Sequence, residues 1–246
     1  MKQEPSEHAS SVLEASRSPD RRAAEFERDG YAIIPNLIDA RECDDLARRL
    51  ESDSGAGAGV GTRCLLASGW CQELARRLKA TPSLAPYMPF GPVAVQCTYF
   101  QKSSGLNWLV PLHQDLSIPV AERIDHASLS GWSRKQSGYY VQPPPETLVG
   151  LVAVRLHIDD CSGEDGPLRV TPGSHRLGRI APSTASEVRR GNGEVVCLVD
   201  RGGAVILRPL LLHASSKSTG RGRRRVLHFV FGPPGLPFGL TWNRAV

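Results

Sequence analysis

The sequence predicts a mainly β protein of the double-stranded β-helix type, a jelly-roll or cupin-like barrel with buttressing helices near its N-terminus. Three observations lead to this prediction. Short apolar stretches with a period of two recur from Val93 onward, helical periodicity is confined to the first third of the chain, and 24 glycines and 19 prolines supply turns between the stretches. With 246 residues and no internal repeat, the chain suits one large β domain.

The N-terminal third contains the predicted helices. The first 22 residues are rich in Ser, Glu and Arg, which predicts a disordered tail (1–22) before a single domain over residues 23–246. The next segments are predicted as a helix over 23–29, a strand over 31–35, a helix capped by Asp39 and ending at Leu50, a glycine-rich loop over 55–61 and a helix over 71–79. Leu46 and Leu50 are one helical turn apart, so they would face the core.

The strands are predicted in the rest of the chain. In the first of them Val93, Val95, Cys97 and Tyr99 would share one face, because alternate side chains of a strand point to the same side. Further strands are predicted over 148–158, 168–170, 195–199, 204–207, 208–216 and 223–231. The segment 117–145 is polar and rich in proline and aromatic residues without clean periodicity, which predicts an irregular, lid-like insert.

The composition argues against several classes of protein. The net charge of +5 comes from dispersed arginine clusters that are typical of solvated faces, and no nucleic-acid-binding motif accompanies them, so we expect no nucleic-acid partner. No apolar run is long enough to cross a bilayer and no apolar signal core is present, which predicts a cytoplasmic protein without a membrane partner. The six cysteines form no CxxC pair, so we expect reduced thiols and not a zinc site or a disulfide scaffold.

A metal site is predicted from two histidines and one aspartate. His113 and Asp115 are two residues apart, so on an extended backbone their side chains leave the same face, and His213 ends a later apolar run. Two imidazoles and one carboxylate form the facial triad of non-haem Fe(II) oxygenases. The spacing occurs a second time in His157 and Asp159, which close an apolar strand just before an acidic turn. We favour the first pair, because it precedes the lid-like insert.

An arginine near His213 gives the predicted metal site a possible anion-binding partner. Arg224 lies eleven residues after His213 and heads the following strand, which we expect to be the antiparallel neighbour of the strand that ends near His213. The planar fork of an arginine binds a carboxylate through two hydrogen bonds. Arg223 and Arg225 compete for this role, because alternation lets only one parity face inward and the pattern does not choose between them.

Four segments together, in this order, resemble the phytanoyl-CoA dioxygenase family of Fe(II)/2-oxoglutarate-dependent oxygenases. They are residues 26–31 (FERDGY), 113–115 (HQD), 166–175 (GPLRVTPGSH) and 213–228. The resemblance implies a jelly roll with Fe(II) held by His113, Asp115 and His213, and with 2-oxoglutarate held by Arg224 and Ser215. It also favours His113 over His157 and Arg224 over its neighbours, and makes the turn that contains His175 structural. The sequence departs from many relatives at Leu112, where they carry an aromatic residue, and in lacking asparagine after His213.

The resemblance implies a hydroxylase that uses O2 to oxidise an unactivated C–H bond of a small-molecule substrate, with release of succinate and CO2. The presence of Asp115 favours hydroxylation over halogenation, and Gln114 would serve hydrogen bonding or packing.

One alternative is a non-catalytic cupin-like barrel that binds a metal or ligand, which would not need Arg224. Another is a structural or interaction barrel without stoichiometric metal. Neither the substrate nor the oligomeric state follows from the sequence. Four aromatic residues would either line a pocket or pack the insert: Trp108, Trp132, Tyr139 and Tyr140.

Overall fold

The computed structural model describes residues 18–53, 62, 64–103, 105–135 and 138–246. Most of the predicted tail and the whole predicted loop over 55–61 therefore lie outside the described residues. The first described helix, α2, begins at Pro19, four residues before the predicted start. Ser18 caps it by accepting a hydrogen bond from the backbone N–H of Arg21, and Gly30 ends it in the left-handed conformation with φ 80°.

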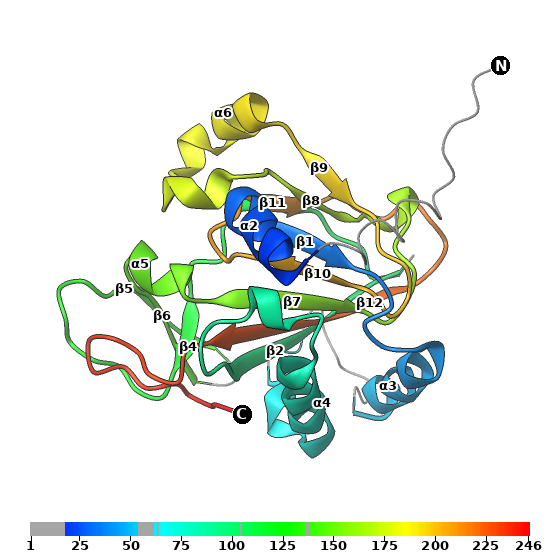
Figure 1. Ribbon diagram of the computed structural model, residues 1–246, viewed down its shortest axis with the longest axis horizontal. Helices are drawn as coiled ribbons and strands as arrows, with labels where there is room; N and C mark the ends of the chain where they lie inside the picture. The colour runs from blue at the N-terminus through cyan, green and yellow to red at the C-terminus, as the bar shows by residue number, and fades with distance from the viewer. Residues whose placement is uncertain (1–17, 54–61, 63, 104, 136–137) are drawn as a thin grey trace.

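Two antiparallel sheets form the barrel (Figure 1), which confirms the jelly-roll prediction. In spatial order the five-stranded sheet contains β1 (Tyr31–Ile34), β10 (Ala204–Leu207), β7 (Val152–His157), β12 (Arg224–Gly232) and β2 (Val93–Lys102). The four-stranded sheet contains β3 (Val110–His113), β11 (His213–Ser215), β8 (Leu168–Val170) and β9 (Val195–Cys197).

The strands that carry His213 and Arg224 are not hydrogen-bonded neighbours, so that prediction was wrong. β11 pairs with β3 and β8, whereas β12 pairs with β2 and β7 in the other sheet. The connection between them crosses from one sheet to the other, as successive strands of a jelly roll commonly do. The predicted strand over 208–216 is correspondingly short, because only His213–Ser215 is extended and paired. His213 and Arg224 therefore lie on opposite walls of one barrel.

Helices pack on the outer face of the five-stranded sheet, as the sequence predicted (Figure 1). α3 (Ala40–Asp53) begins after Asp39, whose carboxylate accepts a hydrogen bond of 2.8 Å from the backbone N–H of Glu42. The α helices in chain order are α2 (Pro19–Asp29), α3 (Ala40–Asp53), α4 (Gly69–Ala80), α5 (Pro145–Val149) and α6 (Pro182–Asn192). Apolar side chains of α3 and α4 meet those of β2, β7 and β12 in one buried cluster that includes Leu46, Leu50, Leu74, Leu78, Leu156 and Phe229.

Short 3-10 turns lie at Leu65–Ala67, Ala85–Tyr87, Gly163–Asp165 and Ser174–Leu177. None of the described helices has both the length and the apolarity needed to cross a membrane.

The segment 117–145 is ordered into a third small sheet, which corrects the prediction of an irregular insert. This sheet has the order β4–β6–β5, with β4 at Ile118–Val120, β6 at Gly138–Gln142 and β5 at Ser130–Lys135. Its strands escaped the sequence analysis because β4 is only three residues long and contains Pro119, while β5 is mainly polar and starts with an irregular register.

Two strand predictions fail locally. Residues 145–149 form α5, and β7 begins only at Val152, so the predicted strand over 148–158 is shorter at both ends. In β2, Ala94 and Gln96 pair with consecutive residues of β12, which leaves Val95 as the extra residue of a β-bulge. Val95 therefore packs in a different apolar cluster from Cys97 and Tyr99, although strict alternation placed all three on one face.

Candidate metal centre and cosubstrate pocket

His113, Asp115 and His213 meet at one end of the four-stranded sheet. His113 ends β3 and pairs directly with His213 on β11, while the backbone N–H of Asp115 donates to the carbonyl of Pro209 at 2.9 Å. Asp115 Oδ1 lies 3.8 Å from His113 Nε2, and Asp115 Oδ2 lies 3.8 Å from His213 Nε2. One ligand atom from each residue lies within 4.8 Å of the other two, a spacing at which a single metal ion can bind all three.

Backbone contacts hold both imidazoles in the orientation that metal binding requires. His113 Nδ1 lies 2.8 Å from the carbonyl oxygen of Pro111, and His213 Nδ1 lies 2.8 Å from that of Leu211. Because a carbonyl only accepts, each Nδ1 carries the proton and each Nε2 presents its lone pair toward Asp115. Burial is the main reason why the pKa of His213 is lowered to about 4, which keeps this ring neutral.

Asp115 is suited to remain ionised in this setting. Burial alone would raise the pKa of its carboxyl, but the attraction of His213, His228 and His113 outweighs burial, and the pKa lies below its ordinary value. The site thus offers two nitrogen donors and one carboxylate. This donor set fits a divalent first-row metal ion, which would keep further coordination positions for other ligands.

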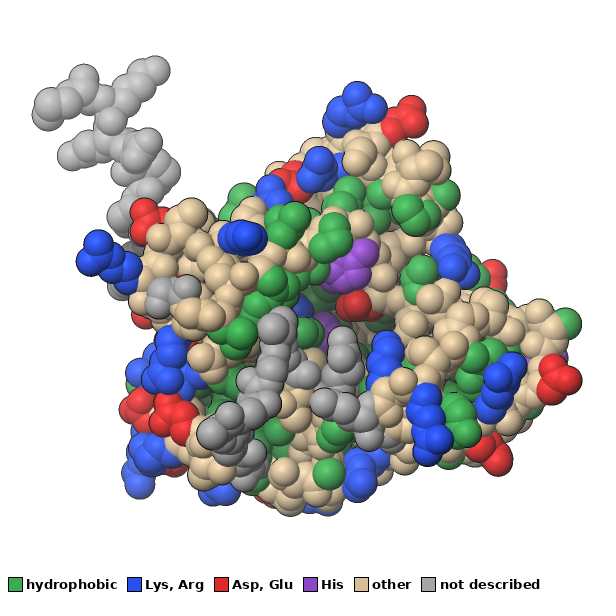
Figure 2. Space-filling model, turned by 180° about the vertical axis from the view of Figure 1, so that it is seen from behind, with side chains coloured by type: hydrophobic (Ala, Val, Ile, Leu, Met, Phe, Trp, Pro, Cys, Tyr) green, Lys and Arg blue, Asp and Glu red, His purple; other side chains and the backbone are tan. Residues whose placement is uncertain are grey.

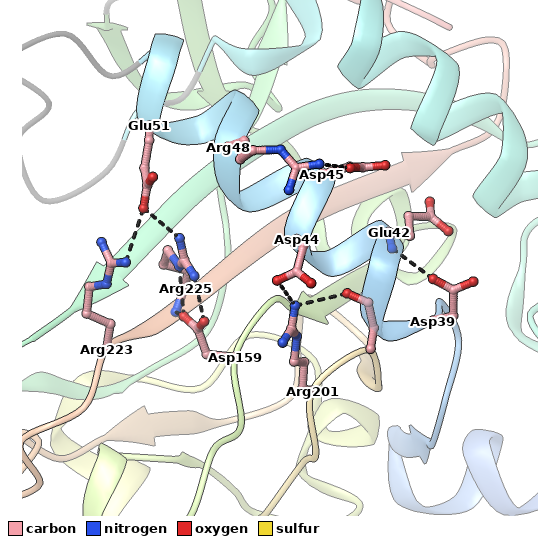
Figure 3. A network of polar contacts seen from close by, with 11 residues as sticks. Asp39, Glu42, Asp44, Asp45, Arg48, Glu51, Asp159, Arg201, Arg223 and Arg225 are labelled. Atoms are coloured by element: carbon pink, nitrogen blue, oxygen red, sulfur yellow. Dashed lines mark hydrogen bonds and ion pairs between the residues drawn. The ribbon is translucent and has the colours of Figure 1, made fainter.

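The second dyad does not converge on a site. His157 is buried at the end of the central strand β7, and neither of its ring nitrogens has a hydrogen-bond partner in the described part of the chain. Asp159 lies beyond the strand on the outer side, where its carboxylate accepts hydrogen bonds from the backbone N–H and the guanidinium of Arg225 (Figure 3). Asp159 is therefore an ion-pair partner of Arg225, and among the described residues only the first dyad gathers a third ligand.

A cavity of about 820 Å³ opens beside the candidate metal ligands, between the two sheets. Figure 2 shows a hollow in this face of the molecule, bordered largely by hydrophobic side chains, with a histidine and an acidic side chain at its edge. The wall opposite the metal ligands is formed by inward-facing residues of the five-stranded sheet: Gln96, Thr98, Phe100, Arg155, Arg224, His228 and Val230. Asp115 is the only carboxylate among the described residues that line this cavity.

Strand alternation on β12 separates the three candidate arginines. Arg224 is buried, lines the cavity and donates a hydrogen bond to the carbonyl of Gly166. Its Nε is buried without a partner, and no carboxylate of the described residues lies within ion-pair distance of its guanidinium. Arg223 and Arg225 turn to the outer face, where both pair with Glu51 (Figure 3). Of these three arginines, Arg224 is therefore the one placed to meet an anion in the cavity.

Ser215 and Lys102 lie next to Arg224. The Ser215 hydroxyl donates to the carbonyl of Gly166 at 2.9 Å, the same oxygen that Arg224 contacts, and Lys102 Nζ donates to Ser215 Oγ at 2.6 Å. Burial is the main cause that lowers the pKa of Lys102 to about 8, with repulsion from Arg224 and Arg155 adding to it. Arg224 and Ser215 on the cavity wall thus lie beside a second cation, Lys102, and this group of two cations and a hydroxyl is suited to a carboxylate.

Sequence reasoning missed Lys102, Arg155 and His228. Lys102 ends β2 with the same parity as the cavity residues Thr98 and Phe100, so extending the alternation past the bulge would have found it. Arg155 interrupts an otherwise apolar strand, which is itself a signal, because a charged residue there must be buried with a partner or a ligand. His228 shares its face of β12 with Arg224.

The remaining predicted residues divide between the cavity and the scaffold. Trp108 and Tyr140 line the cavity, whereas Trp132 and Tyr139 pack against the apolar cluster of the small sheet. Gln114 Nε2 donates to the carbonyls of Gly178 and Leu210, and its Oε1 accepts from the N–H of Ile180, which confirms the predicted hydrogen-bonding role. Nε2 of His175, in its turn, lies 3.1 Å from the carbonyl oxygen of Glu27 in α2 and takes no part in the metal site.

Comparisons with known proteins agree with this architecture. The family model described as "Phytanoyl-CoA dioxygenase (PhyH)" matches residues 26–226. A search of curated protein sequences finds no match. Among solved structures, the non-haem alpha-ketoglutarate-dependent epimerase SnoN from nogalamycin biosynthesis superposes with a TM-score of 0.62 at 22% sequence identity, over 89% of this chain and 85% of SnoN.

Two further structures share the fold at similar distance. EctD from S. alaskensis, in its apo form, gives a TM-score of 0.66 at 18% identity, with 94% of this chain and 85% of EctD covered. HygX from Streptomyces hygroscopicus, with nickel and 2-oxoglutarate bound, gives 0.58 at 17% identity, with 87% and 86% covered. Structural likeness at this identity establishes the fold, while the sequence match covers most of the chain. The chain belongs to the phytanoyl-CoA dioxygenase family of Fe(II)- and 2-oxoglutarate-dependent enzymes.

Proposed function

We propose that this protein is an Fe(II)- and 2-oxoglutarate-dependent dioxygenase that hydroxylates an unactivated C–H bond of a small-molecule substrate. His113, Asp115 and His213 hold the iron, and Arg224 with Ser215 holds 2-oxoglutarate. One observation carries the proposal: the candidate metal ligands and Arg224, which pairs with no carboxylate of the described residues, face the same cavity from opposite walls. A metal-binding barrel without turnover would have no need of that arginine.

The three ligands would act as a rigid platform. Pro111 and Leu211 fix the two imidazoles through their carbonyls, and Pro209 anchors the backbone of Asp115. Little rearrangement is therefore needed on metal binding, which favours affinity. When bound together, Fe(II), 2-oxoglutarate and dioxygen supply the chemistry that oxidises a C–H bond, with release of succinate and CO2.

The cosubstrate pocket would recognise 2-oxoglutarate by the carboxylate remote from the metal. Arg224 offers the planar donor fork. Its guanidinium and the Ser215 hydroxyl both donate to the carbonyl of Gly166, and the Lys102 ammonium donates to the Ser215 hydroxyl. Leu168 also borders this part of the cavity, and the Arg224, Lys102 and Ser215 side chains are all buried. A dianion in this position would neutralise charges to which the described residues offer no carboxylate.

Asp115 supports hydroxylation in particular. With Asp115 bound to the metal ion, the coordination position that a halide would need would be occupied. Oxidation of the C–H bond would then end in transfer of oxygen to the substrate. SnoN is described as an epimerase and the related SnoK as a carbocyclase, so the fold also serves reactions that add no oxygen to the product. Hydroxylation is the outcome that the test below separates from these.

The test is an oxygen-isotope experiment with a pool of small molecules. The protein is loaded with Fe(II) and 2-oxoglutarate, and succinate and product masses are measured under ordinary and heavy-isotope dioxygen. Hydroxylation predicts succinate together with a product that gains one labelled oxygen atom. Succinate with an unlabelled, isomeric or desaturated product would contradict hydroxylation while keeping the enzyme class. Lack of succinate in folded, metal-loaded protein with every pool would favour the non-catalytic barrel.

A further inference from the structure

A third buried cation faces the cavity, and neither the metal site nor the cosubstrate pocket accounts for it. Arg155 lies on the central strand β7 with 8% of its surface exposed, and it lines the cavity. Its Nε is buried without a partner, and no carboxylate of the described residues lies within ion-pair distance of its guanidinium. Burial, followed by repulsion from Arg224, lowers the pKa of Arg155 to about 10, still well above neutrality. The guanidinium is therefore charged and lacks a counter-ion from this part of the chain.

Two neighbours hold the Arg155 guanidinium in place. Its Nη1 lies 3.2 Å from His228 Nδ1, and its centre lies 5.4 Å from the centroid of the Phe100 ring. Arginine can only donate, so His228 Nδ1 accepts and the imidazole proton lies on Nε2, which is 3.9 Å from Asp115 Oδ2. His228 therefore lies between Arg155 and the metal ligands. Because its Nε2 carries the proton, it has no lone pair there with which to act as a fourth ligand.

The register of the sheet places Arg155 at the level of the metal site. Arg155 pairs with His228, which lies four residues along β12 from Arg224, whereas Arg224 itself pairs with Lys102. Arg224 and Ser215, with Lys102 bonded to Ser215, lie at one end of the cavity, whereas Arg155 lies beside His228, whose Nε2 is 3.9 Å from Asp115 Oδ2. An anion on Arg155 would therefore be distinct from the carboxylate that Arg224 is proposed to bind.

The charge balance of the loaded cavity leaves room for such an anion. Arg155, Arg224 and the neighbouring Lys102 contribute three buried positive charges, the half-buried Lys135 on the cavity wall contributes one and Fe(II) two, whereas Asp115 contributes one negative charge and 2-oxoglutarate two. Three positive charges remain, or two if Lys102 is neutral. An unbalanced charge in a cavity of low dielectric constant is costly, and an oxyanion of the substrate would remove that cost.

We propose that the substrate of this enzyme carries a carboxylate and that Arg155 binds it. This inference rests on the proposed function and names the chemical class of its substrate. A carboxylate fits this position, because its two oxygens match the planar donor fork of a guanidinium. The apolar part of the substrate would then extend toward Trp108 and Tyr140 on the cavity wall.

The experiment compares matched pairs of probes that differ only in charge. Benzoate, phenylacetate, hexanoate and octanoate are titrated against their primary amides by calorimetry, under anaerobic conditions, into protein loaded with Fe(II) and 2-oxoglutarate. We expect at least one acid to bind about tenfold more tightly than its amide, as expected when a buried guanidinium gains a charged partner. In Arg155→Gln this preference should disappear, while the dissociation constant of 2-oxoglutarate changes by less than about threefold.

Two variants serve as controls. Arg155→Lys keeps the charge without the fork and should keep part of the preference for acids. Arg134→Gln removes an exposed arginine of β5 that stacks on Tyr139 outside the cavity, and it should leave every affinity unchanged. If Arg155→Gln does not fold, as judged by circular dichroism, the comparison of acids with amides on the wild-type protein and on Arg155→Lys still decides the question.

Three results would overturn the inference. These are equal binding of acids and amides across the whole panel, an Arg155→Gln variant that retains the preference for acids, and an Arg155→Gln variant that loses 2-oxoglutarate in place of the acids. The third result would assign Arg155 to the cosubstrate. Failure of the proposed function has a different signature, because it appears either as wild-type protein that forms no complex with Fe(II) and 2-oxoglutarate or as turnover without transfer of labelled oxygen. The acid and amide titrations on metal-free protein would still report on Arg155 in that case.

Discussion

The chain contains two His-x-Asp sequences with identical spacing, and the fold uses them in opposite ways. His113 ends the edge strand β3 and pairs with His213 on the neighbouring strand β11. Asp115 follows two residues later, and its carboxylate lies 3.8 Å from His213 Nε2. His157 ends the central strand β7 with both ring nitrogens unpartnered, while Asp159 continues to the outer face and pairs with Arg225. Both side chains of the first dyad therefore converge on one site, whereas those of the second dyad diverge, with His157 buried in the barrel and Asp159 on the outer face.

The difference shows that spacing alone does not make a ligand pair. A His-x-Asp pair forms a metal site only where both side chains turn to the same face and a neighbouring strand supplies a third ligand. The same rule separates Arg224 from Arg223 and Arg225, because adjacent residues of a strand point to opposite faces. The four predictions below test this division between the cavity face and the outer face, beginning with the largest expected effect.

The largest effect is expected for Arg224→Ala. Removing the guanidinium takes away the proposed partner of the remote carboxylate of 2-oxoglutarate, and loss of one partner of a buried charge pair costs about 2–5 kcal/mol. The dissociation constant of 2-oxoglutarate, measured by anaerobic titration, should rise roughly a hundredfold or more. Arg223→Ala is the matched control on the outer face and should leave the constant unchanged. An equal loss in both variants would contradict the assignment by alternation.

Asp159→Ala tests the structural role of the second dyad. The carboxylate accepts hydrogen bonds from the backbone N–H, Nε and Nη2 of Arg225, whose side chain is 9% exposed. Removing these acceptors leaves a largely buried guanidinium with only Glu51, so the free energy of unfolding should fall by about 2–3 kcal/mol. Urea denaturation measures this, and metal binding by the folded variant should be unchanged. A stable variant that has lost its metal would reverse the roles of the two dyads.

The ionisation of Lys102 predicts a pH dependence of cosubstrate binding. An anion binds best when Lys102 is protonated, and with a pKa of about 8 this lysine loses its proton as the pH rises from 7 to 9. The affinity for 2-oxoglutarate should therefore fall by up to about tenfold over that range. Lys102→Met should bind more weakly at pH 7 and lose this pH dependence. An affinity that rises with pH in the wild-type protein would contradict the role given to Lys102.

The smallest effect is expected for His157→Leu. The ring has no hydrogen-bond partner, and burial, with repulsion from Arg155 and Arg224, lowers its pKa to about 3, so the native ring is neutral. Replacing an unsatisfied buried polar group by an apolar one should change the free energy of unfolding by less than about 1 kcal/mol. Metal stoichiometry should stay the same, and the matched variant His113→Leu should lose the metal.

Much of the scaffold follows from local pattern. α3 and α4 carry an apolar stripe, Asp39 caps the first of them, and short apolar runs with turn residues mark most strands. The candidate ligands were predictable because His113 and Asp115 share a face, and because His213 and Arg224 occur in an order that resembles a known family. These features depend on a few neighbouring residues, which is why the sequence alone could predict them.

The features that escaped prediction depend on contacts between distant segments. Alternation tells which face a residue takes but not which sheet its strand joins, so β11 and β12 were wrongly expected to pair. The bulge at Val95 and the small sheet around Pro119 depend on partner strands and leave little local trace. α6 buries only Ala185, so it carries no apolar stripe to detect.

The most direct test of the account uses the visible charge-transfer band that forms when Fe(II) and 2-oxoglutarate bind together. Under anaerobic conditions, Fe(II) and then 2-oxoglutarate are added to metal-free wild-type protein, Asp115→Ala and Asp159→Ala. The account predicts the band in the wild-type protein and in Asp159→Ala, and its loss in folded Asp115→Ala. A band that survives in Asp115→Ala but is lost in Asp159→Ala, or that is missing from correctly folded wild-type protein, would contradict the site described above.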